Sequence, residues 1–152
     1  MRFALSAVLF LSVAGAADAQ DGIFVRKCDA TDRISSLAEP WEQNTDQFAN
    51  GDVRIAVIDR VEPAATSFSL LVMSPPRDEL GGRICQVVMA SEGTGFGGFD
   101  FGERGAAYDA QKGLLFDVPV SIYDPASGDF FKRQLSLTIR QDTGEITGRV
   151  LQ

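Results

Sequence analysis

The chain has 152 residues and a formal net charge of −7, and it contains no histidine. Without imidazole, the Ser-His-Asp and Cys-His nucleophile systems and nearly all zinc sites are excluded. The acidic balance also argues against binding to nucleic acid. We therefore expect no catalytic residue of these classes, no metal, no other cofactor and no nucleic-acid partner.

The first residues are typical of a secretory signal peptide. Arg2 supplies a positive start, an apolar run follows from Phe3, and Ala17-Asp18-Ala19 matches an A-x-A cleavage site. The apolar run is shorter than the roughly 20 residues that a membrane-spanning helix needs, and no later run is long enough. The sequence predicts that residues 1–19 are removed and that the protein is exported, to the periplasm or outside the cell, without a membrane span.

Two cysteines, Cys28 and Cys85, follow the predicted cleavage site. An even pair in an exported protein indicates a disulfide, with two buried free thiols as the alternative. The bridge would tie an N-terminal segment, residues 20–43, to a single β domain predicted for residues 44–152.

The N-terminal segment is expected to contain one short helix. The run DATDRISSLAE at 29–39 has the caps of a helix that stops before Pro40. Residues 44–49 precede an Asn-Gly pair that ends at Gly51, a strong hairpin signal, so we expect a strand there. A helix over 40–50, with Pro40 in its first turn and Gly51 just past its end, is the alternative.

From residue 52 onward apolar residues recur with a period of two, which is typical of half-buried antiparallel strands. The run 83–90 is apolar on both parities and predicts a strand covered on both faces. Turns that open with Asp and close with Gly, such as YDAQKG and YDPASG, join neighbouring runs. The expected strands are 44–49, 53–61, 66–74, 83–90, 96–103, 114–122, 130–140 and 145–151.

Eight sequential strands predict an all-β fold, an antiparallel meander that closes into a small up-and-down barrel. The interior of such a barrel holds side chains or one small ligand. A two-layer β-sandwich is the alternative, because alternation alone does not distinguish the two architectures.

The most unusual stretch is GTGFGGFDFGERG at 93–105, which begins with the letters of a dinucleotide-binding fingerprint. No helix pattern follows it, so the confirming context for a nucleotide site is missing. A bent, glycine-rich strand with its phenylalanines in the core is one interpretation. The functional hypothesis is a loop that presents Phe96, together with Phe99 and Phe101, to a ligand or partner.

These observations favour an exported, non-catalytic binding or interaction module. Its expected partner is a small apolar ligand or an envelope protein. One alternative is a carboxylate-dependent hydrolase of the cell envelope, for which Asp100 and Glu103 form one pair of acids. Another is an acidic inhibitor of a basic hydrolase.

Overall fold

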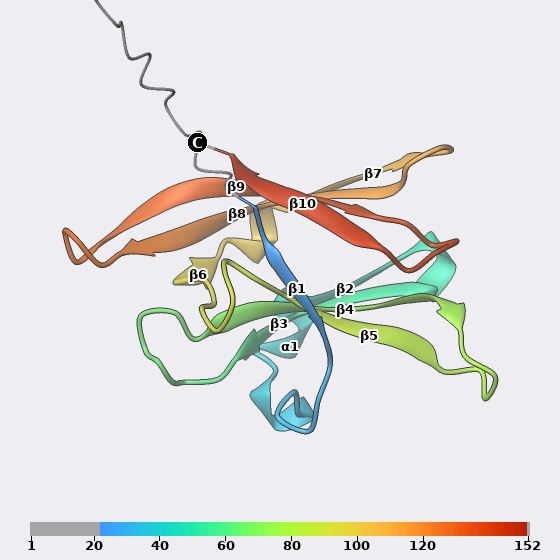
Figure 1. Cartoon of the computed structure of the whole chain (residues 1–152), viewed down its shortest axis with the longest axis horizontal. Coiled ribbons are helices and arrows are strands. Elements are labelled where there is room, and N and C mark those ends of the chain that lie inside the picture. Colours follow the sequence, from blue (N-terminus) through green and yellow to red (C-terminus); the bar gives the residue numbers. More distant parts are fainter. Residues whose placement is uncertain (1–21, 152) are drawn as a thin grey trace, which may run out of the picture.

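The computed structural model describes residues 22–151, so the predicted signal peptide, residues 1–19, lies outside the described part of the chain. Two antiparallel sheets of five strands each stack face to face as a β-sandwich (Figure 1). The predicted all-β antiparallel fold is confirmed.

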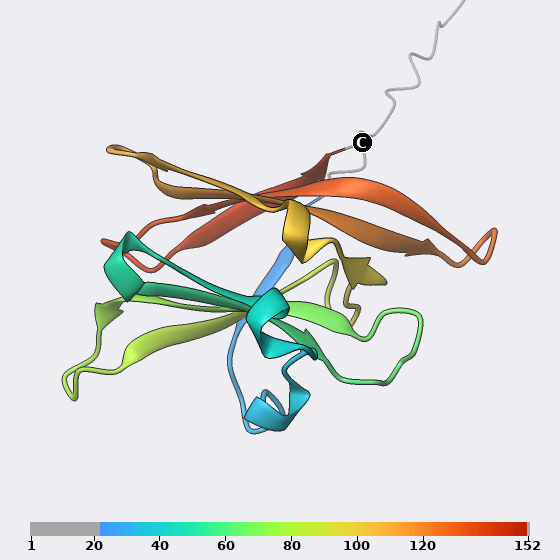
Figure 2. The same cartoon turned by 180° about the vertical axis from the view of Figure 1, so that it is seen from behind.

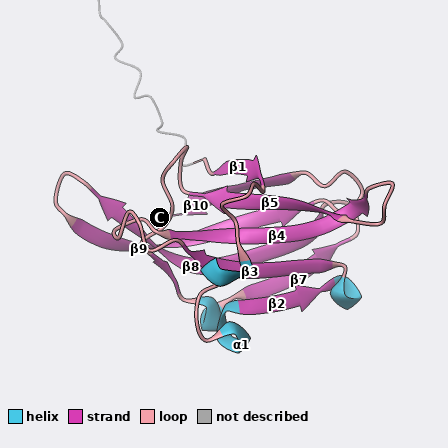
Figure 3. Cartoon of the chain, turned by 90° about the horizontal axis from the view of Figure 1, so that it is seen from below, coloured by secondary structure: helices cyan, strands magenta, loops and turns pink. Residues whose placement is uncertain are grey.

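The first sheet, which lies below in Figure 1, uses the N-terminal half of the chain. Its spatial order is β1 (Phe24–Lys27), β5 (Arg83–Met89), β4 (Phe68–Arg77), β3 (Val53–Asp59) and β2 (Thr45–Phe48). Figure 3, seen from below, shows these strands side by side in this order. Strands β2 to β5 form a meander, and β1 adds to the free edge of β5.

The second sheet uses the C-terminal half, and Figure 2 shows it from behind as the upper layer. Its order is β10 (Ile146–Leu151), β9 (Asp129–Ile139), β8 (Gly113–Asp124) and β6 (Gly98–Phe99), and β7 (Gly105–Asp109) pairs with another part of β8. The helical elements are single turns: η1 (Ile34–Ser36), α1 (Trp41–Asn44), η2 (Ala49–Gly51) and η3 (Phe101–Glu103).

The preferred barrel is wrong, and the two-layer sandwich describes the architecture. On one side the sheets are joined only by the isolated bridge between Gly22 and Arg149, and on the other side β2 does not pair with β6 or β7 within residues 22–151. A barrel requires a continuous ladder around its circumference, and these strands leave it open.

The core lies between the sheets and is built by alternate residues of the central strands. In β8 the inward side chains are buried as the period-two pattern predicts: Leu114, Phe116, Val118 and Val120. They pack with inward residues of the first sheet, among them Val53, Ile55, Val57, Leu70, Val72 and Val88. Side chains therefore fill the space between the layers that a carrier would need for a ligand.

Strand β5 is covered on both faces, as its sequence predicts. Val88 belongs to the core between the sheets, whereas Val87 and Met89 join Ile58 in a smaller apolar cluster. That smaller cluster lies on the outer face of the first sheet, beneath the N-terminal segment.

The predicted helix over 29–39 is not found, and only η1 remains of it. Polar side chains hold this segment in turns instead. The carboxylate of Asp29 accepts hydrogen bonds from the backbone N–H and the hydroxyl of Thr31, and the N–H of Asp29 donates to Asp32. Such local bonds compete with helical ones. The strand predicted over 44–49 is confirmed as β2, and the alternative helix is limited to α1.

The strand predicted over 96–103 is largely wrong, since only Gly98–Phe99 pair with β8 before the chain enters η3. Two strands were not predicted. Strand β1 has four residues, and β7, with the sequence GAAYD, consists of mostly exposed residues without apolar alternation. Strand β1 is too short to show a period of two, and β7 lacks the alternating apolar residues that would reveal one.

Two segments cross between the sheets. Gly22 pairs with Arg149 in the second sheet, and the chain then enters β1 in the first sheet. Phe96 exchanges two backbone hydrogen bonds with Phe68 at the start of β4, and Gly98 then pairs with β8. These crossings connect the layers without closing them.

Candidate functional site

The three phenylalanines of the glycine-rich stretch lie within or against the core. Phe96 is 0% exposed and Phe101 is 3% exposed, while Phe99 is half-buried. The rings of Phe96 and Phe99 meet edge to face at 5.0 Å, and Phe101 lies 6.2 Å from Phe116. In this conformation they do not form an exposed surface, which agrees with the expectation that they lie in the core, although only Gly98–Phe99 of the stretch form a strand.

The glycines beside Phe96 are required by close packing. A Cβ at Gly95 would overlap the carbonyl oxygens of Phe68 and Thr66, and one at Gly97 would overlap the ring of Phe130. Backbone and ring therefore occupy the space that a side chain would need. The six letters GTGFGG mark a crossing between sheets rather than a phosphate-binding turn.

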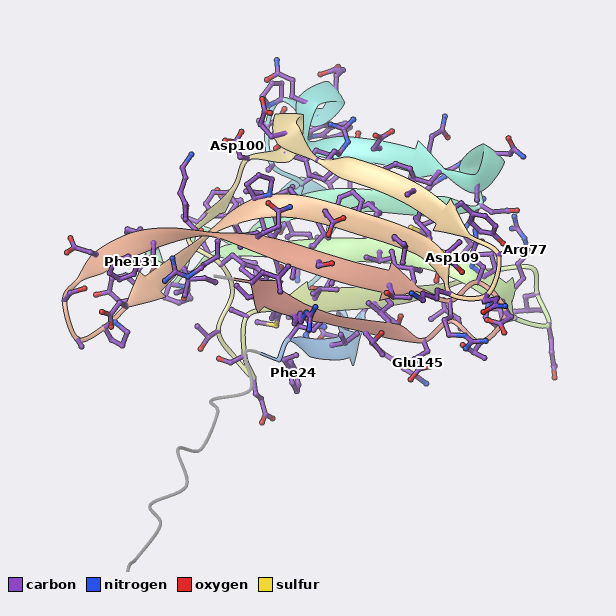
Figure 4. The ribbon with its side chains drawn as sticks, turned by 90° about the horizontal axis from the view of Figure 1, so that it is seen from above. Phe24, Arg77, Asp100, Asp109, Phe131 and Glu145 are labelled. Carbon is purple, nitrogen blue, oxygen red and sulfur yellow. A yellow bond between two sulfur atoms is a disulfide. The ribbon has the colours of Figure 1, made fainter. Side chains whose placement is uncertain are left out.

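The carboxylates considered for hydrolysis do not share a cleft. Asp100 is exposed, precedes η3, and lies 3.5 Å from the ammonium of Lys132. Two hollows border Asp100, of about 180 and 530 Å³, and Glu103 lines neither. Figure 4 places Asp100 at the outer margin of the sandwich. The geometry gives this pair no common substrate position.

The predicted disulfide is present and joins Cys28 to Cys85, with their Cα atoms 5.3 Å apart. It anchors residues 28–38, which we call the N-terminal cover, to the outer face of the first sheet. Two further contacts hold the far end of the cover: Leu37 bridges to Ile58, and the N–H of Ala38 donates to Val57. In Figure 1 the cover lies beneath the lower sheet.

A buried ion-pair cluster fixes the middle of the cover. Both oxygens of Asp32 accept from Arg26 in β1, each at 2.8 Å, and Arg60, just after β3, pairs with the same carboxylate. Burial alone would raise the pKa of Asp32, but the Arg26 hydrogen bond, the Asp29 N–H and the two positive charges outweigh it, so the pKa lies below its ordinary value. Asp32 is therefore ionised at neutral pH.

Beside the cover lies a groove of about 790 Å³, which we call the outer groove. Its floor is the outer face of β2, β3, β4 and β5. Two rows of cross-strand neighbours form it: Thr45, Ala56 and Leu71, and next to them Gln47, Arg54, Met73 and Cys85. Its wall is the cover, from Asp32 to Leu37, where the side chain of Ile34 is 74% exposed. The accessible surface of the groove is mostly apolar.

The charges around the outer groove do not cancel. Its two carboxylates are neutralised, since Asp32 pairs with Arg26 and Arg60, and Asp46 pairs with Arg104. Arg33 and Arg54 also line it, and neither lies within 4.0 Å of a carboxylate in the described part of the chain. An acidic protein thus presents two guanidinium groups without a carboxylate partner, among the residues that the structure describes, at an apolar groove.

A second exposed apolar feature is the β8–β9 hairpin, which projects beyond the sandwich in Figure 1. Near its tip Phe130 and Phe131 are 49% and 42% exposed, and Tyr123 lies 5.3 Å from the Phe130 ring. Figure 4 shows Phe131 at this projecting end. We call residues 123–131 the aromatic hairpin. A hollow of about 610 Å³ beside it is lined by Tyr123, by other residues of the second sheet and by the loops that adjoin β4 and β5.

Sequence reasoning missed the outer groove, although β4 carries a usable signal. Leu71 and Met73 are apolar, although they alternate with the inward residues Leu70 and Val72 and so point outward. An apolar residue on the outward parity of a central strand predicts that the outer face also has a covering or a ligand. The adjacent pair Phe130-Phe131 carries a similar signal for the aromatic hairpin.

Among residues 22–151, no three or more metal-ligating side chains gather, and no helix is both long and apolar enough to cross a membrane. No family model, no curated protein and no solved structure matches the chain.

Proposed function

We propose that the protein is an exported, non-catalytic binding module that holds a small, largely apolar ligand in the outer groove. The observation that carries this proposal is the groove itself: an apolar floor, an exposed Ile34 on the wall and a volume of about 790 Å³. Ligand sites in proteins are concave, mostly apolar and roughly 300–1,000 Å³ in volume.

The N-terminal cover, which forms the wall of the groove, is anchored at three points. The disulfide fixes one end of the N-terminal cover, the Asp32 cluster fixes its middle, and the bridge from Leu37 to Ile58 fixes the other end. A preformed wall lowers the entropic cost of holding a ligand. A disulfide in this role suits an oxidising compartment, which supports export.

Binding of the uncharged dye N-phenyl-1-naphthylamine, followed by its fluorescence, tests the proposal. Met73→Glu places a charge on the groove floor and should abolish the binding. The matched control is Leu115→Glu, a half-buried leucine in β8, a central strand of the second sheet. Equal dye binding by both variants and the original protein would place the site elsewhere, and no dye binding by any of them would count against a small-molecule binding module.

The aromatic hairpin favours a protein partner as a second candidate. Adjacent exposed phenylalanines on a projecting hairpin are typical of residues that anchor an interface. A double Phe130→Ser, Phe131→Ser variant should lose a partner that the original protein recovers from an envelope extract. Leu80→Ser is the control, because Leu80 is 97% exposed in the β4–β5 turn.

A further inference from the structure

We infer that the ligand of the outer groove is an amphipathic anion: an apolar body that carries one carboxylate or comparable acidic group. This inference rests on the proposed function and adds the chemical class of the ligand. It depends on how the charges are distributed around the groove rather than on the groove's apolar floor.

The first step is the position of Arg54. It lies in the same cross-strand row as Met73 on β4 and Gln47 on β2, and its neighbour two residues along β3 is Ala56. Its guanidinium therefore emerges from the floor next to apolar side chains. Arg33 lies on the wall, directly before Ile34 in the chain. Each arginine thus adjoins an apolar surface.

The second step is the contrast with the other arginines of this region. Arg26, Arg60 and Arg104 each have a carboxylate partner within hydrogen-bond distance. Within residues 22–151 the Arg33 side chain donates only to the carbonyl of Ala30, and no hydrogen bond from the Arg54 side chain is found. The chain carries 21 acidic against 14 basic residues, so carboxylates are plentiful, yet within residues 22–151 none lies within 4.0 Å of the side chain of Arg33 or Arg54.

The third step is complementarity. A guanidinium beside an apolar surface binds a carboxylate through charge-assisted hydrogen bonds, which are stronger than neutral ones. A neutral apolar molecule would use the floor and leave both arginines without a partner. A cationic molecule would be repelled by them. An anionic amphiphile satisfies the floor and the arginines together.

The size of the groove favours a small molecule over a macromolecule. Its volume of about 790 Å³ lies within the range of sites that enclose a ligand of drug or lipid size. We therefore commit to a long-chain carboxylate as the representative ligand and use dodecanoate as its probe.

Titration calorimetry of the purified protein with dodecanoate, dodecanol and dodecylammonium separates the contribution of the head-group charge from that of the apolar chain. Dodecanoate should bind about tenfold more tightly than dodecanol, as expected for one charge-assisted interaction. Dodecylammonium should bind more weakly than either. The double variant Arg33→Gln, Arg54→Gln should bind dodecanoate and dodecanol alike, while Arg149→Gln, an exposed arginine of β10, should leave the preference unchanged.

Two results would overturn the inference and leave the proposed function intact. One is equal affinity of the original protein for dodecanoate and dodecanol, and the other is a carboxylate preference that survives in the double variant. If none of the three compounds binds and the uncharged dye does not bind either, the proposed function itself fails. Circular dichroism of the double variant checks that it keeps its fold.

Discussion

Arg26 and Asp32 form a bidentate ion pair in which Nη1 donates to Oδ2 and Nη2 donates to Oδ1, each at 2.8 Å. The Asp32 side chain is 0% exposed, and Arg60 adds a second positive charge. One carboxylate thereby connects β1, the N-terminal cover and the end of β3. This carboxylate therefore fixes the middle of the groove wall to two separate parts of the first sheet.

Asp32→Asn should lower the free energy of unfolding by about 3 kcal/mol at neutral pH, since it leaves two partly buried guanidinium groups without their counter-charge. Urea denaturation measures this. The matched control is Asp142→Asn, because Asp142 also pairs with an arginine, Arg140, but both side chains are exposed. That variant should change stability by less than about 0.5 kcal/mol. Similar losses in the two variants would contradict the structural role of the buried cluster.

The contribution of Asp32 should disappear in acid. Burial favours its neutral form but is outweighed, chiefly by the Arg26 hydrogen bond, so its pKa in the folded protein lies below the ordinary 3.8. A carboxyl group with a depressed folded-state pKa stabilises the protein above the unfolded-state pKa, and this stability is lost as the pH falls through the folded-state pKa. The difference in urea midpoint between the original protein and Asp32→Asn should therefore be constant above about pH 5 and shrink below pH 3.8. A difference in urea midpoint that grows as the pH falls would contradict a lowered pKa of Asp32 in the folded protein.

Replacing both cysteines by serine should cost about 4 kcal/mol, because the bridge closes a loop of 57 residues in the unfolded chain. The same variant releases one end of the groove wall, so its dye binding should weaken as well. Intact mass after alkylation, without reduction, checks the bridge directly. Two alkylated cysteines in the native protein would show that the disulfide does not form.

Phe96→Ser should destabilise the protein by about 3–5 kcal/mol, as expected for truncating a fully buried phenylalanine. Phe131→Ser removes the same group from the exposed aromatic hairpin and should cost less than about 1 kcal/mol. Thermal unfolding of the two variants makes the comparison. If Phe96→Ser were as stable as Phe131→Ser, Phe96 would not be a core residue. The hypothesis that Phe96 is presented to a ligand or partner would then be favoured.

Gly95→Ala should cost about 2 kcal/mol, because its Cβ would meet the backbone oxygens of Phe68 and Thr66, which cannot move aside without breaking the crossing. Gly102→Ala is the control: it lies in η3, where a Cβ has open space and the backbone φ is not positive. Its effect should stay within about 0.5 kcal/mol. Equal effects would mean that the crossing is not tightly packed.

The sequence predicts the interior of this protein better than its outer faces. Alternation in β8 and in the second half of β9 identifies the inward residues, because burial on one face leaves a period of two. The same pattern does not distinguish a sandwich from a barrel, since that depends on whether edge strands meet. Here the edge strands are β1 and β10, and the isolated bridge between Gly22 and Arg149 is the contact that joins the two sheets on this side.

The sequence does not predict the outer groove for a related reason. The outer groove combines β2, β3, β4 and β5 with a cover whose path depends on Asp29 and Asp32, and side-chain pairs of this kind leave no periodic trace. The glycine-rich stretch was interpreted as a candidate binding loop because of its composition. Its glycines serve close backbone packing, which composition alone does not distinguish from a binding loop.

The bridge between Gly22 and Arg149 has a consequence for the order in which the molecule is completed. Strand β1 pairs with β5, whereas Gly22, which precedes β1, pairs with β10, the strand that follows all the others in the described part of the chain. Long-range pairings of this kind form slowly, because the chain between them must first be ordered. The bridge of Gly22 therefore forms only once β10 is in place, whereas β1 can pair with β5 before that.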